Sequence, residues 1–221
     1  MNSIDLTLFH LINDEWANPF LDHFLPGIAS TDIWTPILIA AAVIALVMGG
    51  LRGRVLVLCV GMGLLLGDSV LSHTLKHLVN RTRPRDAMAG VYVRGLSHVE
   101  PRILHVFDPP VVKVTRGPSK AHGQSFPSSH VLNLFMLTTA MWCFHRRLGW
   151  AVGCMALLVG YSRVYTGAHW PSDIPFSALM GVIVGLIVVR VTKALALHFK
   201  WIQNAGVASN ELGACHRVVR T

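Results

Sequence analysis

Apolar residues occur along this chain in five blocks of roughly membrane-spanning length. The blocks cover residues 33–49, 55–78, 131–144, 148–164 and 174–191. A helix needs about 17–25 residues to cross the hydrocarbon layer, so the second and fifth blocks suffice and the others need a few flanking residues. The runs lack the alternation of a β-barrel, which is the other fold that can cross lipid. The pattern therefore predicts an all-α fold, a polytopic transmembrane bundle with five spans.

The first 32 residues differ, because apolar side chains recur there at helical spacing with acidic side chains between them. This spacing predicts two short amphipathic helices at the membrane interface or packed on the bundle, separated by Asn18 and Pro19. Lys and Arg are absent before Arg52, so we do not expect a cleaved signal peptide. The predicted organisation is amphipathic helices in 1–32, a membrane domain in 33–200 with an outer loop at 81–127, and a cytoplasmic tail in 201–221.

The composition suits a membrane protein, because 52% of the residues are hydrophobic and only 14% are charged. The formal net charge is +8, and its distribution predicts an orientation. Arg52 and Arg54 link the first two blocks, Arg146 and Arg147 link the third and fourth, and further basic residues follow the fifth. Basic links are retained in the cytoplasm. We therefore expect the N-terminus and the segment 81–127 on the outer side.

That outer segment breaks the rule, because it is rich in basic residues. They are Arg81, Arg83, Arg85, Arg94, Arg102, Lys113, Arg116 and Lys120, against the acidic Asp86, Glu100 and Asp108. Basic residues on the outer side, against the positive-inside rule, indicate a functional role, and binding of anionic phosphate suits their charge. For five of them, solvated loop charge or contact with anionic headgroups is the favoured interpretation. These five are Arg94, Arg102, Lys113, Arg116 and Lys120.

The first polar patch ends the second block. Lys76 and Arg83 are seven residues apart, so two helical turns would place an ammonium and a guanidinium on one face as a phosphate clamp. Snorkelling of basic side chains at a helix end is the alternative. Asp68 lies within the same block, where we expect a polar partner on a neighbouring helix and a structural role.

The second patch, residues 125–130, opens the third block. Pro127 is typical of a helix start, so the free amides of the first turn and the hydroxyls of Ser128 and Ser129 would form an anion site. His130 lies just inside that turn, where it can move a proton.

The third patch, residues 162–173, joins the fourth and fifth blocks. Asp173 follows His169 by four residues, so one helical turn would let the carboxylate accept a proton from the imidazole and leave the other nitrogen free as a nucleophile. A plain hydrogen-bonded histidine is the alternative. The order of the spans puts all three patches at the same end of the bundle, and the orientation was inferred from residues outside them.

Together, the patches resemble the three-part signature of the type-2 phosphatidic acid phosphatase superfamily. The matching residues are Lys76, Arg83, Pro84, Pro127, Ser128, Ser129, His130, Ser162, Arg163, His169 and Asp173. The superfamily includes membrane lipid phosphatases, undecaprenyl diphosphate phosphatases, glucose-6-phosphatases, soluble acid phosphatases and vanadium haloperoxidases. The resemblance runs from the second block to the fifth. Ser129 departs from it, because the family usually has Gly there, which lets the backbone approach phosphate closely.

The resemblance implies a hydrolase that forms a phosphohistidine. His169 would attack phosphorus, Asp173 would orient it, and His130 would protonate the leaving oxygen and act as base on the return step. The groups implied to hold the phosphate oxygens are Lys76, Arg83, Ser128, Arg163 and the amide of Ser129. No metal or other cofactor is implied.

We therefore expect a phosphatase of the bacterial inner (cytoplasmic) membrane, with its active site on the periplasmic or outer side. Its partners would be a phosphorylated lipid and the bilayer, without nucleic acid. Candidate lipids are undecaprenyl diphosphate, phosphatidylglycerophosphate, phosphatidic acid and lipid A, and the sequence leaves the choice and the oligomeric state open. One alternative is a vanadium haloperoxidase, although those relatives are soluble. Another is a non-catalytic binder or transporter of phosphorylated lipid, against which the complete set of His130, His169 and Asp173 argues.

Overall fold

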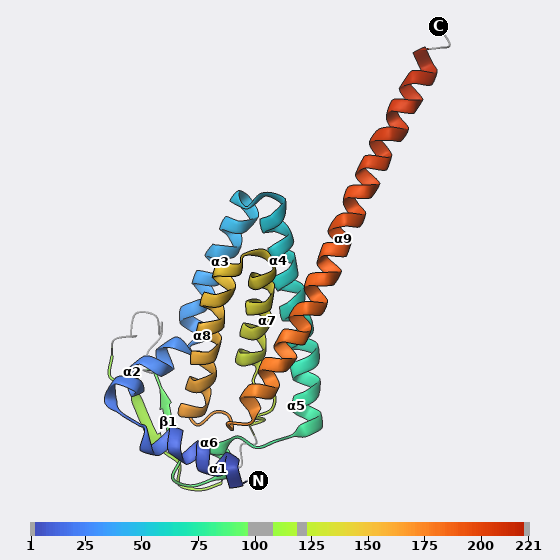
Figure 1. Ribbon diagram of the computed structural model, residues 1–221. Helices are drawn as coiled ribbons and strands as arrows, with labels where there is room; N and C mark the ends of the chain where they lie inside the picture. Colours follow the sequence, from blue (N-terminus) through green and yellow to red (C-terminus); the bar gives the residue numbers. More distant parts are fainter. Residues whose placement is uncertain (1–2, 97–107, 119–122, 219–221) are drawn as a thin grey trace.

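The computed structural model describes residues 3–96, 108–118 and 123–218, and side chains as far as residue 198. Most of the described chain forms a bundle of long helices (Figure 1). The bundle consists of α3 (Thr31–Met48), α4 (Gly50–Leu64), η2 (Leu65–Ser72), α5 (His73–Val79), α7 (Ser129–Phe144), α8 (Arg146–Tyr165) and α9 (Asp173–Val218). The predicted transmembrane helical bundle is therefore confirmed.

Four helices in the described chain are long and apolar enough to cross a membrane. They are Thr31–Met48, Gly50–Val79, Arg146–Tyr165 and Asp173–His198, and the second of them runs through α4, η2 and α5. The helix α7 occupies the predicted third span but has only 16 residues. The count of five spans is therefore not established. The helix α9 continues past residue 200 without a break, so no change of structure marks the predicted start of a separate tail.

The central helix of the bundle is α7, which packs against α4, α8 and α9 (Figure 1). Gly181 and Gly185 of α9, four residues apart, face it. A Cβ atom on Gly181 would collide with the carbonyl oxygen of Leu132, and one on Gly185 would come within 2.7 Å of the Cβ of Thr139. Small residues at this spacing let two membrane helices approach until their backbones nearly touch. This contact brings the N-terminal ends of α7 and α9 together.

The carboxylate of Asp68 lies in η2, a π-helical stretch of the second candidate span. Its side chain is exposed, and within the described structure it makes no hydrogen bond or ion pair. The expectation of a polar partner on a neighbouring helix is therefore wrong. A π-helical turn shifts the following residues around the helix axis relative to an α-helix, and Asp68 instead faces an opening that it shares with Ser69, His73 and Lys76.

The N-terminal residues form two short helical segments across one end of the bundle (Figure 1). The first is α1 (Ser3–His10) continued by η1 (Leu11–Glu15), and the second is α2 (Pro19–Ile28). As expected, Asn18 and Pro19 separate them, because the Asn18 side chain accepts a hydrogen bond from the Leu21 amide at 3.0 Å and Pro19 occupies the first helical position.

The outer loop contains α6 (Pro84–Ala87) and a two-stranded antiparallel sheet, which the all-α prediction missed. Strand β1 (Tyr92–Gly95) pairs with β2 (Val111–Val114), with Tyr92 opposite Val114. Asn13 of η1 ties this sheet to the bundle, because its side-chain amide donates to the carbonyl oxygens of Tyr92 at 2.9 Å and Tyr165 at 2.8 Å. The sheet therefore lies at the same end of the bundle as the N-terminal helices.

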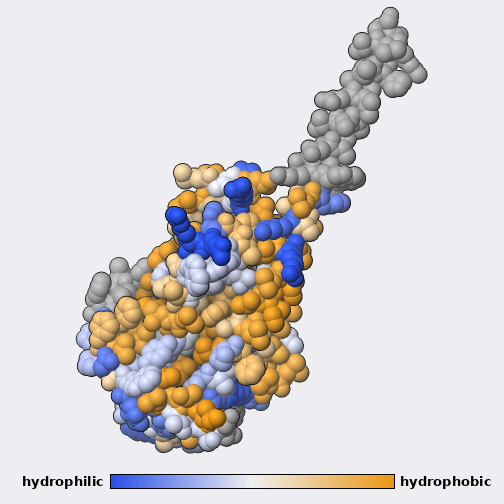
Figure 2. Space-filling view, in the orientation of Figure 1, coloured by the Kyte–Doolittle hydropathy of each residue, from blue (hydrophilic) through white to orange (hydrophobic). Residues whose placement is uncertain are grey.

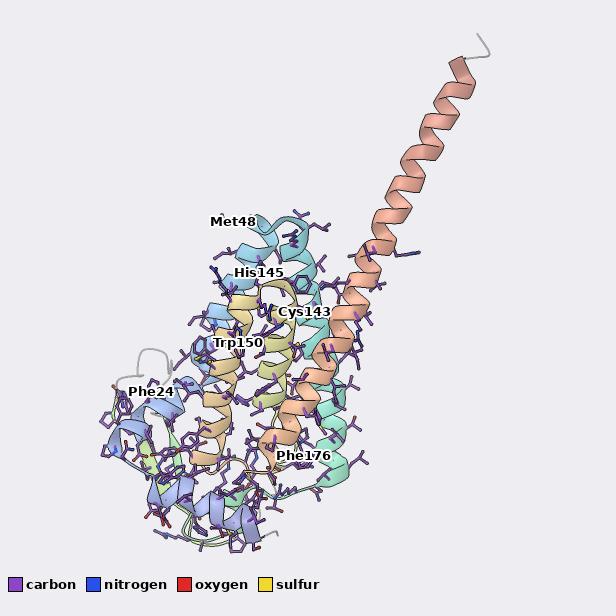
Figure 3. All side chains as sticks on the ribbon, viewed as in Figure 1. Phe24, Met48, Cys143, His145, Trp150 and Phe176 are labelled. Carbon is purple, nitrogen blue, oxygen red and sulfur yellow. The ribbon has the colours of Figure 1, made fainter. Side chains whose placement is uncertain are left out.

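The two ends of the bundle differ from its middle in polarity. Hydrophobic side chains dominate the middle of the visible face, and hydrophilic ones gather toward each end (Figure 2). Met48 and His145 mark one end, whereas Phe176 lies near the other, where the N-terminal helices, the sheet and the predicted polar patches are found (Figure 3).

Candidate active site

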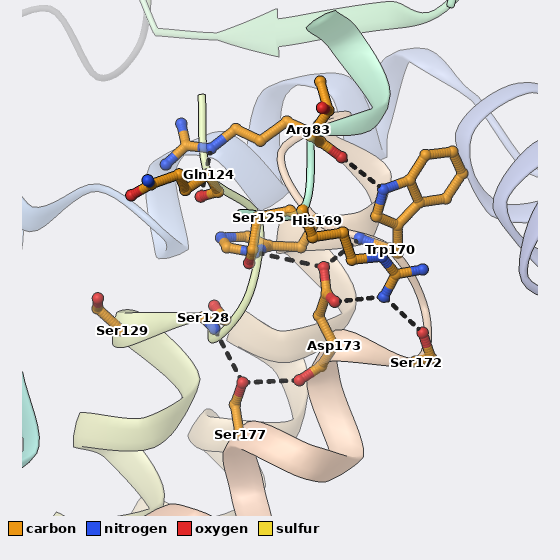
Figure 4. Close-up of polar contacts among 12 residues, drawn as sticks. Arg83, Gln124, Ser125, Ser128, Ser129, His169, Trp170, Ser172, Asp173 and Ser177 are labelled. Carbon is orange, nitrogen blue, oxygen red and sulfur yellow. Dashed lines mark hydrogen bonds and ion pairs between the residues drawn. The ribbon is translucent and has the colours of Figure 1, made fainter. Parts of the chain in front are cut away.

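The three polar patches meet at one end of the bundle, as the predicted order of spans requires. Residues 81–83 run beside residues 123–125, because the Ser125 amide donates to the Arg81 carbonyl at 2.6 Å and the Arg83 amide donates to the Gly123 carbonyl at 3.0 Å. The ring of His169 reaches the same segment, with Nδ1 at 2.6 Å from the Ser125 carbonyl oxygen (Figure 4). Hydrogen bonds to the backbone of residues 123–125 thus join all three patches.

The relation between Lys76 and Arg83 differs from the prediction. The helix α5 ends at Val79, and Asn80 adopts a left-handed conformation with φ of 44°. Arg83 therefore follows the helix rather than sharing a face of it with Lys76. The two cations still meet the second patch, since Lys76 Nζ donates to Ser129 Oγ at 2.7 Å and Arg83 Nε donates to the Gln124 carbonyl at 3.2 Å.

The helix α7 starts at the second patch, with Ser128 as its N-cap. The amide of Ser128 donates to Ser177 Oγ at 2.8 Å, and that hydroxyl donates in turn to the Asp173 carbonyl at 2.7 Å. The Ser128 hydroxyl is buried without a hydrogen-bond partner. The first amides of a helix also lack intrahelical partners. This turn therefore presents unsatisfied donors, beside the side chain of His130.

His169 lies in the turn before α9 rather than on a helix, and Asp173 is the first residue of α9. The Asp173 carboxylate oxygen Oδ2 is 3.8 Å from His169 Nδ1, whereas the Ser125 carbonyl is at 2.6 Å. The Ser125 carbonyl is thus the nearest acceptor for the Nδ1 proton, and the Asp173 carboxylate is the more distant of the two. A proton on Nδ1 leaves the other ring nitrogen, Nε2, with its lone pair.

Burial lowers the pKa of His169 to about 4, although Asp173 opposes this shift. The positive charges of Arg163 and Arg83 act in the same direction as burial. The imidazole is therefore neutral at pH 7, which is the form that can act as a nucleophile.

Asp173 is held by a network that the sequence analysis did not anticipate. Its Oδ1 accepts a hydrogen bond from Arg81 Nη1 at 2.5 Å, and its Oδ2 accepts one from the Trp170 amide at 2.9 Å. The other amino group of Arg81 pairs with Asp5 of α1, and Asp5 also accepts hydrogen bonds from the amide and hydroxyl of Ser172. Spacing along α9 identifies Ser177, four residues after Asp173, but no sequence signal connects Asp5 to this network.

Three guanidinium groups at the site form no ion pair within the described structure. Among the described residues, Arg83, Arg85 and Arg163 form no ion pair, and Arg163 Nε is buried without a hydrogen-bond partner. Burial lowers the pKa of Arg83 below its usual range, and the positive charge of Arg85 adds to this shift, although the Asp86 carboxylate opposes it. These three cations are partly buried. Removing a charge from water without an ion-pair partner is costly, so this cluster is suited to binding an anion.

The basic residues of the outer segment that were expected to be solvated or bound to headgroups differ in burial. Arg94 is buried, with Nε 2.5 Å from Asp22 Oδ1 and Nη1 donating to the Asn13 carbonyl at 2.7 Å. The expected solvated or headgroup-bound charge is wrong for Arg94, because it instead fastens η1 and α2 to β1. Lys113 and Arg116 are exposed, whereas Arg102 and Lys120 lie outside the described residues. In the described part of the chain, no group of three or more His, Cys, Asp or Glu side chains is arranged to hold a metal ion.

Comparison with known proteins identifies relatives over most of the chain. A putative undecaprenyl-diphosphatase, YbjG of Escherichia coli, is 29% identical over 187 residues, which cover 83% of this chain and 80% of that protein. The lipid A 4'-phosphatase of Bacteroides thetaiotaomicron is 25% identical over 186 residues, covering 82% and 73%. Two Bacillus proteins match over only 64 and 71 residues, so the chain spans about a third of their length.

Among solved structures, the crystal structure of Aquifex aeolicus LpxE superimposes with a TM-score of 0.59 and 25% identity, over 86% of this chain and 96% of that one. The family model described as the PAP2 superfamily matches residues 54–196, a range that contains all three patches. This protein is a multi-pass membrane protein that belongs to the PAP2 superfamily, as its three patches predicted.

Proposed function

We propose that this protein hydrolyses a lipid phosphate or diphosphate through a phosphohistidine formed on His169. One observation carries the proposal: the buried donors Ser128 Oγ and Arg163 Nε have no partner within the described structure, and they belong to the same cationic end of the bundle as a neutral, oriented imidazole. A phosphoryl group supplies the acceptors that these donors lack.

The reaction would begin with attack of His169 Nε2 on phosphorus. The Nδ1 proton stays on the ring, hydrogen-bonded to the Ser125 carbonyl oxygen, which lies 2.6 Å from Nδ1. The Asp173 carboxylate stabilises the positive charge that develops on the ring. Lys76, Arg83, Ser128, Arg163 and the amide of Ser129 would bind the non-bridging oxygens, where negative charge accumulates. His130 would give a proton to the leaving oxygen and then take one from the water that releases inorganic phosphate.

The position of the site fits a substrate anchored in lipid. The site lies at one end of the bundle, and α3 and α4 carry exposed apolar side chains that suit contact with acyl or prenyl chains. The basic residues Arg52, Arg54, Arg146 and Arg147 follow closely after Met48 and His145, which mark the opposite end of the bundle (Figure 3). By the positive-inside rule, the site faces the periplasmic or outer side of the bacterial inner membrane.

Undecaprenyl diphosphate and a phospholipid headgroup phosphate remain the proposed substrates. The relatives that match along most of the chain are named for an undecaprenyl diphosphate and for lipid A, so their names alone do not choose between diphosphate and monophosphate.

The test is phosphate release by the purified protein in detergent, measured over a panel of lipid monophosphates and diphosphates. Wild type should turn over at least one of them, and His169→Ala should reduce the rate to background while keeping its helical content. Rapid acid-free quenching with radiolabelled substrate should trap label on wild type and none on His169→Ala. Full activity in His169→Ala would exclude His169 as the nucleophile, and a wild type that binds but never turns over these lipids would favour the non-catalytic alternative.

A further inference from the structure

A cavity of about 260 Å³ lies next to the proposed reaction site. Its lining includes His130, Arg163 and Thr166 from the bundle, Arg85 from α6, and Ser30 and Thr31 at the start of α3. We propose that this cavity binds the phosphate that remains on the leaving group, with Arg85 as its principal ligand, so that the enzyme prefers lipid diphosphates to monophosphates. This inference rests on the proposed function.

The location of the cavity matches the side from which the leaving group departs. His130, the proposed proton donor to the leaving oxygen, lines the cavity, whereas His169 does not. Arg163 borders both regions, because it lines the cavity and also acts electrostatically on His169. A group attached to the leaving oxygen would therefore enter this cavity, and the transferred phosphoryl group would stay on the side of His169.

The cavity also extends in the direction that a lipid chain requires. Its lining reaches Ser30 and Thr31, where α3 begins. Beyond this point α3 exposes large apolar side chains, including Ile37, Leu38 and Ile39, and is a candidate membrane span. A diphosphate in the cavity would thus have its prenyl or acyl chain leading toward the hydrocarbon layer.

Arg85 is available to bind an anion. Its amide donates to the Gly167 carbonyl at 3.2 Å, which fixes α6 against the turn that carries His169. Its guanidinium forms no hydrogen bond or ion pair with any other described residue, and it lies near the like charges of Arg83 and Arg163. Such a group gains from a bidentate contact with phosphate more than an already paired arginine does.

The remaining charges of the lining do not replace Arg85. Arg94 is occupied by Asp22 at 2.5 Å. Asp32, an exposed carboxylate of the described lining, belongs to the first turn of α3, whereas Arg85 belongs to α6. The anion subsite is therefore assigned to the end formed by Arg85, Arg163 and His130.

The chemistry explains why such a subsite distinguishes the two substrate classes. In a lipid diphosphate, attack on the terminal phosphorus breaks its bond to the bridging oxygen, and that oxygen leaves with a proton from His130 as part of a lipid monophosphate. Water then releases the terminal phosphate from His169 and restores the proton to His130. The leaving group of a diphosphate is thus itself an anion, which Arg85 stabilises. The leaving group of a monophosphate is an alcohol and offers Arg85 no charge.

The test compares farnesyl diphosphate with farnesyl monophosphate, which share one prenyl chain, using the purified full-length protein in detergent. Wild type should have the higher kcat/KM for the diphosphate. Arg85→Gln should lower the ratio of the two kcat/KM values about tenfold, the size expected for loss of one charge-assisted contact. Arg116→Gln, which removes an exposed charge from the same outer segment, should leave the ratio unchanged.

A second measurement does not depend on the folding of any variant. Inorganic pyrophosphate fills both subsites and inorganic phosphate only one, so pyrophosphate should inhibit wild type at a concentration at least tenfold lower. An unchanged ratio in folded Arg85→Gln, or equal inhibition by the two anions, would overturn the subsite while leaving the phosphatase proposal standing. A wild type that hydrolyses neither farnesyl substrate nor any other lipid phosphate would overturn both.

Discussion

Arg81 fixes the position of Asp173: its Nη1 donates to Asp173 Oδ1 at 2.5 Å, inside the bundle end where the Asp173 side chain is completely buried. A buried carboxylate needs donors for its oxygens, and Arg81 together with the Trp170 amide provides them. Arg81 also pairs with Asp5, so the N-terminal helix α1 is part of the support of the site. The position of the Asp173 carboxylate, next to His169, therefore depends through Arg81 on Asp5, which lies 168 positions earlier in the chain.

We expect Asp5→Ala to lower kcat about tenfold with little change in KM, because Asp5 contacts Arg81 and Ser172 rather than the proposed phosphate site. Asp14→Ala, which removes an exposed carboxylate from the neighbouring η1, is the matched control. Steady-state kinetics with a lipid phosphate, together with thermal unfolding of both variants, measures the effect. A change confined to the unfolding temperature would mean that Asp5 stabilises the fold without positioning Asp173.

The stability provided by Asp5 should also depend on pH. Burial alone would raise the pKa of its carboxyl, but hydrogen bonds from Ser172 and Arg81 outweigh burial and hold the pKa below its usual value. The folded state thus favours the ionised form, so this stabilisation is present above about pH 4 and is lost as the pH falls through the lowered pKa. The difference in unfolding free energy between wild type and Asp5→Ala should therefore shrink toward pH 3.

A different acid limit applies to His169. Its pKa of about 4 means that the imidazole, the proposed nucleophile, stays neutral well below pH 6.5. After correction for ionisation of the substrate phosphate, kcat/KM should fall on the acid side near pH 4. Asp173→Asn removes a group that raises the pKa of His169, so this limb should move to still lower pH while the plateau rate drops by orders of magnitude. A plateau within a few-fold of wild type would reject the pairing of Asp173 with His169.

Protonation of His169 should also lower the stability of the fold at acid pH, in the same direction as its effect on kcat/KM. An unfolded histidine takes up a proton near pH 6.5, whereas the folded His169 resists protonation until about pH 4. Stability contributed by this site is therefore complete above pH 6.5 and decreases as the pH falls across that interval.

The sequence alone was sufficient to predict those features of the fold that depend on the boundary between lipid and water. Polar residues such as Lys76, His130 and His169 stand at the ends of apolar blocks, and the alternation of direction between consecutive spans places them at one end of the bundle. The lengths of the spans were predicted less well. The helix α7, which is surrounded by other helices, has only 16 residues. Burial by neighbouring helices reduces the length of apolar sequence that a helix must show.

Other features depend on contacts that local sequence does not encode. The left-handed Asn80 ends α5 and carries Arg83 off the helix, so the seven-residue spacing from Lys76 was misleading. The Ser125 carbonyl, rather than a carboxylate one turn away, is nearest to His169 Nδ1. Asp5 reaches Arg81 across 76 positions. The short sheet has strands of four residues, too few to show a period of two.

Ser129 is the residue at which the sequence departs from the motif it resembles, and the structure gives it a specific contact. Its hydroxyl accepts from Lys76 Nζ at 2.7 Å and is hydrogen-bonded to Ser72 Oγ at 2.7 Å. We expect this contact to orient the ammonium before substrate binds. Ser129→Ala should therefore raise KM several-fold, and Lys76→Ala should raise it further. In a double-mutant cycle, Ser129→Ala should have little additional effect once Lys76 is absent, whereas additive effects would show that the two side chains act independently.

The last prediction concerns the packing that sets the geometry of the site. Gly181 lies where α9 crosses α7, and a Cβ atom there would collide with the Leu132 carbonyl and come within 2.9 Å of the Phe135 Cβ. Backbone cannot yield as a flexible side chain does, so Gly181→Ala must push the two helices apart. These helices begin at Ser129 and Asp173 and carry His130 and the support of His169.

We therefore expect Gly181→Ala to lower the unfolding temperature and to reduce kcat at least tenfold, since small displacements of positioned groups slow catalysis strongly. Gly61→Ala in α4 is the control, because a Cβ there meets nothing within 4 Å and alanine favours a helix more than glycine. Thermal unfolding and lipid phosphate hydrolysis of the two variants separate the outcomes. Equal behaviour of Gly181→Ala and Gly61→Ala would show that the close approach of α7 and α9 is not what holds the catalytic groups in register.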